Sequence, residues 1–161
     1  MHPHMQKTTL TLTLLFGLLV GSHQASAQSS DSINLTDNNI YIDIGIGLFM
    51  QESINYERKL VNGKSVSLYG RVGAGIGANF YPDNIPIGLG GLAGVTMLTG
   101  KKNHHFELST NVFVGDDLDG NGIFAMPVVT TGYRFQEPQG GGIFRLKLGL
   151  AEIGFGIGYA F

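Results

Sequence analysis

The sequence predicts an all-β fold, an eight-stranded antiparallel up-and-down barrel. Apolar and polar residues alternate with a period of two in eight separate segments, which is typical of strands with one apolar face. Turn-forming residues separate most of these segments. Glycine accounts for 25 of the 161 residues, whereas only 14% of the residues are charged. A chain of this length is expected to form one domain.

The first residues have the pattern of a secretory signal peptide. Lys7 supplies the positive charge, an apolar run follows at 10–20, and Ala25-Ser26-Ala27 fits a cleavage site. The apolar run is shorter than the about 20 residues of a spanning helix. Because the chain has no cysteine, disulfides, thiolate metal sites and a lipid-anchored N-terminus are excluded. The expected organisation is a signal peptide at 1–27, a polar leader at 28–38 and a barrel at 39–161.

The alternation defines each strand in turn, and no helical stripe appears after the signal. The expected strands are 40–48, 54–60, 66–76, 87–97, 106–114, 129–135, 144–150 and 153–161. The clear turns between them are 62–63, 82–84, 100–103, 119–122 and 138–141. The first and last hairpins, near Gln51-Glu52 and Ala151-Glu152, have weaker turn residues. An even number of strands with short connections predicts antiparallel neighbours throughout.

Periodicity alone leaves open which face of the barrel is apolar. A soluble periplasmic lipocalin-like ligand carrier would turn its apolar rows inward, whereas a transmembrane β-barrel turns them toward lipid. The other face consists mainly of glycine, serine, threonine and asparagine. Glycine is costly on a water-facing strand, but small residues suit the narrow interior of eight strands. Composition therefore favours the transmembrane barrel.

Charged residues of both signs occur on this same inward face. Buried charges are tolerated when they are paired, and an Arg or Lys that faces lipid at the midplane costs about 2–4 kcal/mol. We therefore expect an interior ion network. Its predicted members are Asp43, Glu57, Lys59, Arg71, Glu107, Arg134, Arg145 and Lys147. Arg58 falls on the apolar face near a strand end, where its side chain can reach the headgroups.

The last strand carries a local pattern of its own. Tyr159 and Phe161 are aromatic at alternate positions, and Gly156 stands five residues before the end. These residues resemble the C-terminal signal by which the barrel-assembly machinery reads bacterial outer-membrane barrels. The family pattern has a polar residue two positions before that glycine, where this chain has Gly154. The alternative is an ordinary amphipathic strand. The resemblance implies the assembly machinery as a partner during biogenesis.

Most of the barrel segment resembles a family of small outer-membrane β-barrel proteins of Bacteroidota, of the eight-stranded OmpA/OmpX-like class. The stretches that carry the resemblance are 54–60, 98–108, 132–136 and 156–161. The resemblance implies a location in the bacterial outer membrane with lipid as the main partner, and it supplies no activity. With both termini in the periplasm, the turns near Asn62-Gly63, Lys101-Lys102 and Pro138 face the periplasm, and short loops face outward.

One loop resembles half of a calcium site. Asp117, Asp119 and Asn121 alternate before Gly122, as oxygen ligands do in a calcium loop. The position that requires a bidentate glutamate holds Val128 instead. The alternative, which we favour, is a hairpin loop rich in turn-forming residues. Calcium is therefore the one cofactor that the sequence suggests, and only weakly.

Two further motifs are better explained as ordinary strand or turn residues than as binding sites. His104-His105 has no neighbouring ligands in sequence that would complete a metal site. Gly88-x-Gly90-x-x-Ala93 matches a dinucleotide fingerprint, but that motif needs a helix after it, and here a strand pattern continues.

The functional expectation is a monomeric barrel with a packed polar interior and a structural or envelope-interaction role, without catalytic residues. The main alternative is a lipid-modifying outer-membrane barrel enzyme, although the chain contains no Gly-x-Ser-x-Gly elbow. A porin-like channel is disfavoured because eight strands enclose no wide aqueous pore. A formal net charge of −2 argues against nucleic acid as a partner.

Overall fold

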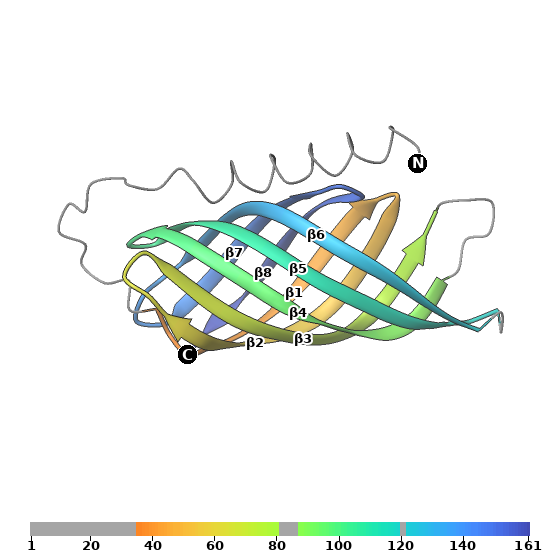
Figure 1. Ribbon diagram of the computed structural model, residues 1–161, viewed down its shortest axis with the longest axis horizontal. Coiled ribbons are helices and arrows are strands. Elements are labelled where there is room, and N and C mark those ends of the chain that lie inside the picture. Colours follow the sequence, from red (N-terminus) through yellow and green to blue (C-terminus); the bar gives the residue numbers. More distant parts are fainter. Residues whose placement is uncertain (1–34, 81–86, 120–121) are drawn as a thin grey trace, which may run out of the picture.

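Eight antiparallel strands close into a single barrel in the computed structural model, which describes residues 35–80, 87–119 and 122–161 (Figure 1). The strands are β1 (Asn38–Gly47), β2 (Phe49–Asn62), β3 (Val66–Asn79), β4 (Ile87–Lys101), β5 (His104–Asp117), β6 (Ile123–Gln136), β7 (Gly141–Gly149) and β8 (Glu152–Ala160). Each strand pairs with its neighbours in the sequence, so the predicted all-β, up-and-down topology is confirmed. Within the described ranges, no helix is long and apolar enough to cross a membrane.

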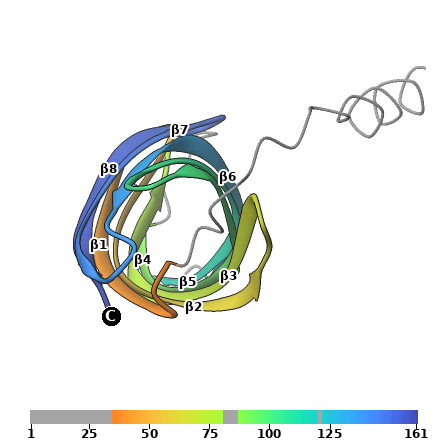
Figure 2. The ribbon, with the colours of Figure 1, turned by 90° about the vertical axis from the view of Figure 1, so that its left-hand side faces the viewer.

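The first and last strands close the barrel. Ile40 of β1 lies opposite Tyr159 of β8, and the pairing continues to Gly47 and Glu152. At the end of this seam, the Asn38 amide donates to the Phe161 carbonyl oxygen (3.0 Å), and the Phe161 amide donates to that of Asn38 (2.8 Å). Figure 2 views the barrel from the end that holds the C-terminus, and the strands form a complete ring.

We name the two ends of the barrel by their connections. The terminal end holds the start of β1, the end of β8 and the turns β2–β3, β4–β5 and β6–β7. The loop end holds the other four connections. The β6–β7 turn lies where the sequence predicts it, with the Gly140 amide donating to the Glu137 carbonyl oxygen (3.2 Å). Gly140 has a φ of 95°, a conformation that favours glycine.

Strand alternation places the apolar rows outside and the polar rows inside. In β5, Phe106, Leu108 and Val112 are exposed, whereas Glu107 and Ser109 between them are buried. The same alternation runs through β1, β2, β7 and β8. The interior is therefore filled by the face that carries the charges.

Inward-facing glycines make room for larger side chains on the neighbouring strands. Gly156 lies opposite both Asp43 and Arg145, and Gly94 lies opposite both Arg71 and Asn111. A Cβ added to Gly156 would collide with the Asp43 carboxylate. The abundance of glycine thus follows from packing bulky polar groups into a narrow barrel.

The first hairpin differs from the sequence prediction. We expected a loop near Gln51-Glu52, but both residues lie in β2 and the connection is at Leu48. Inward Phe49 and Gln51 continue the alternation toward the turn, and Gln51 Nε2 donates to Ser53 Oγ (2.7 Å) inside the barrel. In the last hairpin, Glu152 likewise belongs to β8 rather than to a loop.

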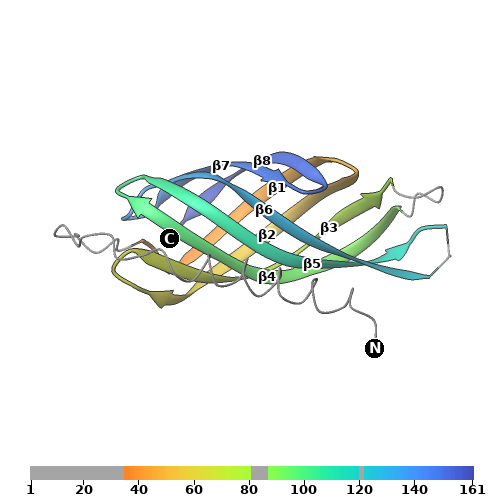
Figure 3. The same ribbon diagram turned by 45° about the horizontal axis from the view of Figure 1, so that its top comes forward.

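The barrel is taller on one side, and β6 on that side is longer than the sequence predicts. This strand begins at Ile123 instead of residue 129, and it extends beyond β7 (Figure 3). Its pairing with β7 begins only at Thr130, so the stretch 123–129 pairs with β5 alone. Pro127 lies in this stretch, where proline is tolerated because a strand edge needs fewer backbone donors.

Candidate functional site

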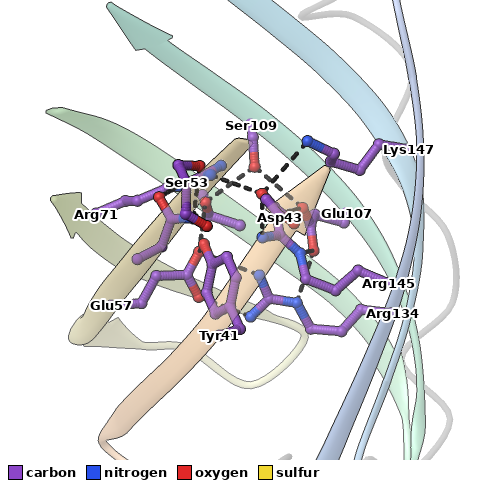
Figure 4. A network of polar contacts seen from close by, with 12 residues as sticks. Tyr41, Asp43, Ser53, Glu57, Arg71, Glu107, Ser109, Arg134, Arg145 and Lys147 are labelled. Carbon is purple, nitrogen blue, oxygen red and sulfur yellow. Dashed lines mark hydrogen bonds and ion pairs between the residues drawn. The ribbon is translucent and has the colours of Figure 1, made fainter. Parts of the chain in front are cut away.

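A network of charged side chains fills the middle of the barrel (Figure 4). We define the ion network as Asp43, Glu57, Arg71, Glu107, Arg134, Arg145, Lys147 and Glu152, all of them buried. These residues come from seven strands, and Thr96 of β4 joins them by donating from Oγ1 to Glu57 Oε1 (2.9 Å). The ion network therefore connects all eight strands.

Two arginines hold the buried glutamates Glu57 and Glu107, and Glu107 is bound by both of them. Arg134 binds both carboxylate oxygens of Glu57, with Nη1–Oε2 and Nη2–Oε1 distances of 2.7 and 3.1 Å. Its Nε also donates to Glu107 Oε2 (2.6 Å). Arg145 binds the same Glu107 carboxylate through Nε and Nη2. Bidentate pairs of this kind are the strong, geometrically specific form of ion pair.

One oxygen of Asp43 receives three cations. Arg71 Nη2, Arg145 Nη1 and Lys147 Nζ lie 2.6, 2.9 and 3.3 Å from Asp43 Oδ2. Lys147 Nζ also contacts Glu152 Oε1 (3.2 Å), and this contact adds β8 to the network. The other Asp43 oxygen faces Gly156 across the β1–β8 seam.

Tyr41 organises the centre of the network. Its hydroxyl donates to Glu57 Oε1 (2.6 Å). Three guanidinium groups lie over its ring, with Arg145, Arg71 and Arg134 at 4.2, 5.3 and 5.7 Å from the centroid. A phenol ring attracts cations to its face, so Tyr41 reduces the repulsion among these arginines.

The charges of the ion network balance. Four carboxylates (Asp43, Glu57, Glu107 and Glu152) accompany four cations (Arg71, Arg134, Arg145 and Lys147). Each of the four carboxylates contacts at least one of these cations. Removing one partner from such a set leaves an uncompensated buried charge, which is far costlier than the pair itself.

Toward the loop end the interior becomes apolar, which the prediction of a polar interior missed. We define the aromatic cluster as Phe49, Leu92, Phe113 and Val128, with Phe124, Met126 and Ala151 packed against it. Phe113 is central, with its ring centroid 5.7 Å from that of Phe49 and 5.9 Å from that of Phe124. The signal was present in the sequence, because inward Leu92 and Phe113 interrupt otherwise polar rows.

At the terminal end, the segment before β1 covers the interior. Leu35 packs against Tyr69 and Leu98, and all three are buried. The Tyr69 hydroxyl donates to the Thr36 carbonyl oxygen (2.9 Å), and Gln136 Nε2 donates to Thr36 Oγ1 (3.3 Å). The ion network therefore lies between two covered ends.

The structure brings together seven of the eight predicted network residues and separates one. Lys59 lies at the terminal end, where Nζ pairs with Asp37 Oδ1 (2.7 Å) and donates to the Leu35 carbonyl oxygen. Lys59 remains in register opposite Tyr69, one inward position nearer the terminal end than Glu57, which lies opposite Arg71. Glu152 also belongs to the ion network, although the weak turn residues near it predict a loop at this position.

The predicted calcium loop is described only in part. The Asp117 amide donates to the Gly122 carbonyl oxygen (3.0 Å), and the Asp119 amide donates to Asp117 Oδ1 (3.2 Å). Asn121 lies outside the described residues. The contacts that are described belong to a hairpin turn, and no group of three or more metal-ligating side chains occurs among the described residues.

The two other motifs fall on strands. His104 is exposed, with Nδ1 at 2.7 Å from the Tyr133 hydroxyl, whereas His105 is buried inside the barrel. Alternation thus places the two imidazoles on opposite faces. Gly88, Gly90 and Ala93 all belong to β4, and no helix follows them.

Comparison of the chain with models of protein families, with characterised proteins and with solved structures found no match. The class of protein is therefore defined by its geometry alone. It is a closed eight-stranded β-barrel with a charge-balanced interior and an apolar outer surface.

Proposed function

We propose that the chain is a small, monomeric bacterial outer-membrane β-barrel with a structural or envelope-interaction role and without enzymatic activity. Residues 1–27 would direct export and be removed, and Gly156, Tyr159 and Phe161 would be read by the barrel-assembly machinery. The proposal concerns the location of the barrel and what its surfaces contact. It rests on the outer surface, the lengths of the strands and the filled interior.

The observation that carries the proposal is the inversion of polarity between the surface and the interior. Ile54 and Ile153 are each 60% exposed, whereas Arg134 and Arg145 are fully buried. Soluble monomers rarely expose contiguous apolar patches larger than a few hundred Å². A surface of this kind is stable in contact with acyl chains, and its exposure to water would cause aggregation.

The dimensions of the strands support this environment. The shortest strands, β7 and β8, have 9 residues each, and β1 has 10. A tilted strand needs about 9–11 residues to cross the hydrocarbon core. The outward charged residues on the strands lie toward strand ends, with Arg58 and Lys101 near the terminal end and Glu52 and Asp116 near the loop end.

Aromatic side chains gather on the outer surface near the terminal end. We define the aromatic belt as Tyr56, Phe106, Tyr133, Phe144, Tyr159 and Phe161, all exposed. The Tyr56 hydroxyl donates to Asn38 Oδ1 (2.7 Å) at the start of β1. Aromatic girdles with polar tips are typical of the water–lipid interface of membrane barrels.

The filled interior supports a structural role over conduction or catalysis. Arg134 bridges Glu57 and Glu107, Arg145 also binds Glu107, and the aromatic cluster fills the loop end. An interior of this kind ties the strands together and leaves the two ends and the outer surface to meet partners.

Fractionation and gel mobility test the proposal. When the full chain is expressed in a Gram-negative host, we expect it in the outer-membrane fraction. We also expect its mobility on gels to change when the sample is boiled. A matched pair of variants tests whether the apolar outer surface faces lipid. Leu146→Arg, on the outward face of β7, should block assembly, whereas Leu150→Arg, in the β7–β8 turn, should not. Recovery of folded protein in the soluble periplasmic fraction would contradict the proposal and favour the lipocalin-like carrier.

A further inference from the structure

The charges outside the ion network are segregated between the two ends of the barrel. Every basic side chain of the described residues that lies outside the network is at the terminal end, namely Arg58, Lys59, Lys64, Lys101 and Lys102. Acidic side chains at that end are Asp37, which pairs with Lys59, and Glu137. The described charged residues of the loop end outside the network are all acidic: Glu52, Asp116, Asp117 and Asp119.

The basic side chains of the terminal end are close to the aromatic belt. Arg58 follows Tyr56 on the outward face of β2, and both residues are exposed. Lys101 lies opposite His104, whose Nδ1 is 2.7 Å from the Tyr133 hydroxyl. Tyrosines of such belts lie at headgroup level, so in a bilayer these cations would lie at the level of the lipid phosphates.

An apolar groove on the outer surface leads to this basic end. It is shallow and open on its outer side, has a volume of about 520 Å³ and is lined mainly by Ile40, Ile42, Ile54, Ile157 and Tyr159. Gly158, which has no side chain, lies in its floor. The outward pair Ile40–Tyr56 is followed by the pair Asn38–Arg58. An acyl chain in the groove would therefore bring its headgroup to the Arg58 guanidinium.

We propose that the terminal end of the barrel binds anionic phospholipid, with the phosphates at Arg58, Lys101 and Lys102 and one acyl chain in the groove along β8, β1 and β2. This inference rests on the proposed function, because it requires the outer surface to lie in a bilayer. It adds a lipid class, anionic phospholipid, to the periplasmic placement that the sequence already predicts for the terminal end. Juxtamembrane Lys and Arg side chains are attracted to such headgroups.

Lipid selectivity in vesicles tests the inference. The folded chain is reconstituted in an equimolar mixture of phosphatidylcholine and phosphatidylglycerol, and the association of spin-labelled forms of each lipid with the protein is compared. We expect a preference for phosphatidylglycerol of about threefold or more at low salt, which weakens at high salt because surface charges are screened.

Two matched variants localise the effect. Arg58→Gln/Lys101→Gln/Lys102→Gln should lose most of the preference, whereas Glu52→Gln/Asp116→Asn at the loop end should retain it. Equal association of the two lipids with the wild-type barrel, or a preference that survives the triple substitution, would overturn the inference. A chain that does not insert into either lipid would instead contradict the proposed function, so the two failures are distinguishable.

Discussion

The ion network and the aromatic cluster fill neighbouring parts of one narrow interior by different physical means. In the network, Arg134 and Arg145 hold two glutamates through directional bonds, and all eight strands take part. In the aromatic cluster, Phe49 and Phe113 fill space by contact between rings. The first arrangement depends on every partner, whereas the second depends mainly on volume.

The two regions therefore differ in how well they are expected to tolerate amino-acid substitutions. Buried charges fix which side chains meet, because a missing partner leaves a charge without compensation. Apolar packing accepts substitutions that keep the volume. We therefore expect the middle of the interior to be intolerant of conservative change and the loop end to accept it. Three substitutions test this contrast, and a fourth prediction concerns the terminal end outside both regions.

The largest effect is expected from Arg145→Met. The substitution removes a cation from Glu107 and Asp43 while keeping a long apolar stem, and a broken buried pair costs about 3–5 kcal/mol. Urea unfolding of the barrel in vesicles measures the change in the free energy of unfolding. Arg145→Lys, which keeps the charge, should cost less. A Met variant as stable as the wild type would remove the contrast between the two regions.

A smaller loss is expected from Gly156→Ala. The new Cβ would collide with Asp43, whose Oδ2 is fixed by three cations, and overpacking of this kind costs about 1–3 kcal/mol. Gly142→Ala is the matched control, since a Cβ at Gly142 meets nothing within 4 Å. The same unfolding assay should show the control unchanged or slightly stabilised. Equal losses in both variants would point to backbone effects instead of network packing.

Phe113→Leu should cost less than either network change. Leucine keeps most of the apolar contact with Phe49 and Leu92 and leaves only a small cavity, so we expect a loss of less than about 1.5 kcal/mol. The measurement is again urea unfolding, with Phe113→Asn as the variant that should fail because it places an unpaired polar group there. If Phe113→Leu were as damaging as Arg145→Met, the aromatic cluster would not be the tolerant region.

The smallest effect concerns the pair of exposed Asp37 and part-buried Lys59 at the terminal end, outside both regions. The hydrogen bond and the charge of Lys59 hold the pKa of Asp37 below its usual value. This pair therefore stabilises the terminal end above the ordinary carboxyl pKa, and the contribution is lost as pH falls through the lowered value. Carboxyl NMR titration should show the lowered pKa rising in Lys59→Gln. An unchanged pKa would show that the pair does not form in solution.

The sequence was sufficient for the topology because alternation determines both the strand and the face of each residue. Asp43, Glu57 and Glu107 could be placed inside the barrel with the basic residues, since all fall on the row opposite the apolar one. Their pairing required no exact register, because in an interior this narrow the inward side chains of all strands are within reach of one another.

Other features depended on turns and register, which alternation does not determine. Glu152 was missed because its strand begins sooner than the turn residues indicate, and Lys59 lies outside the network because its inward position is nearer the terminal end, beside Asp37. The early start of β6 required knowledge that residues 123–129 pair on one side only, which makes Pro127 acceptable. These are properties of the closed barrel and not of any single strand.

In the proposed function, the outward row of each strand faces lipid, whereas the inward row is shielded by the packed interior. The chain has no cysteine, so single cysteines can be introduced and spin-labelled along β5 at Leu108, Ser109, Thr110, Asn111 and Val112. In reconstituted vesicles, Leu108, Thr110 and Val112 should be accessible to oxygen and protected from a water-soluble nickel reagent, whereas Ser109 and Asn111 should be shielded from both. High accessibility of Leu108 and Val112 to the nickel reagent would contradict the account.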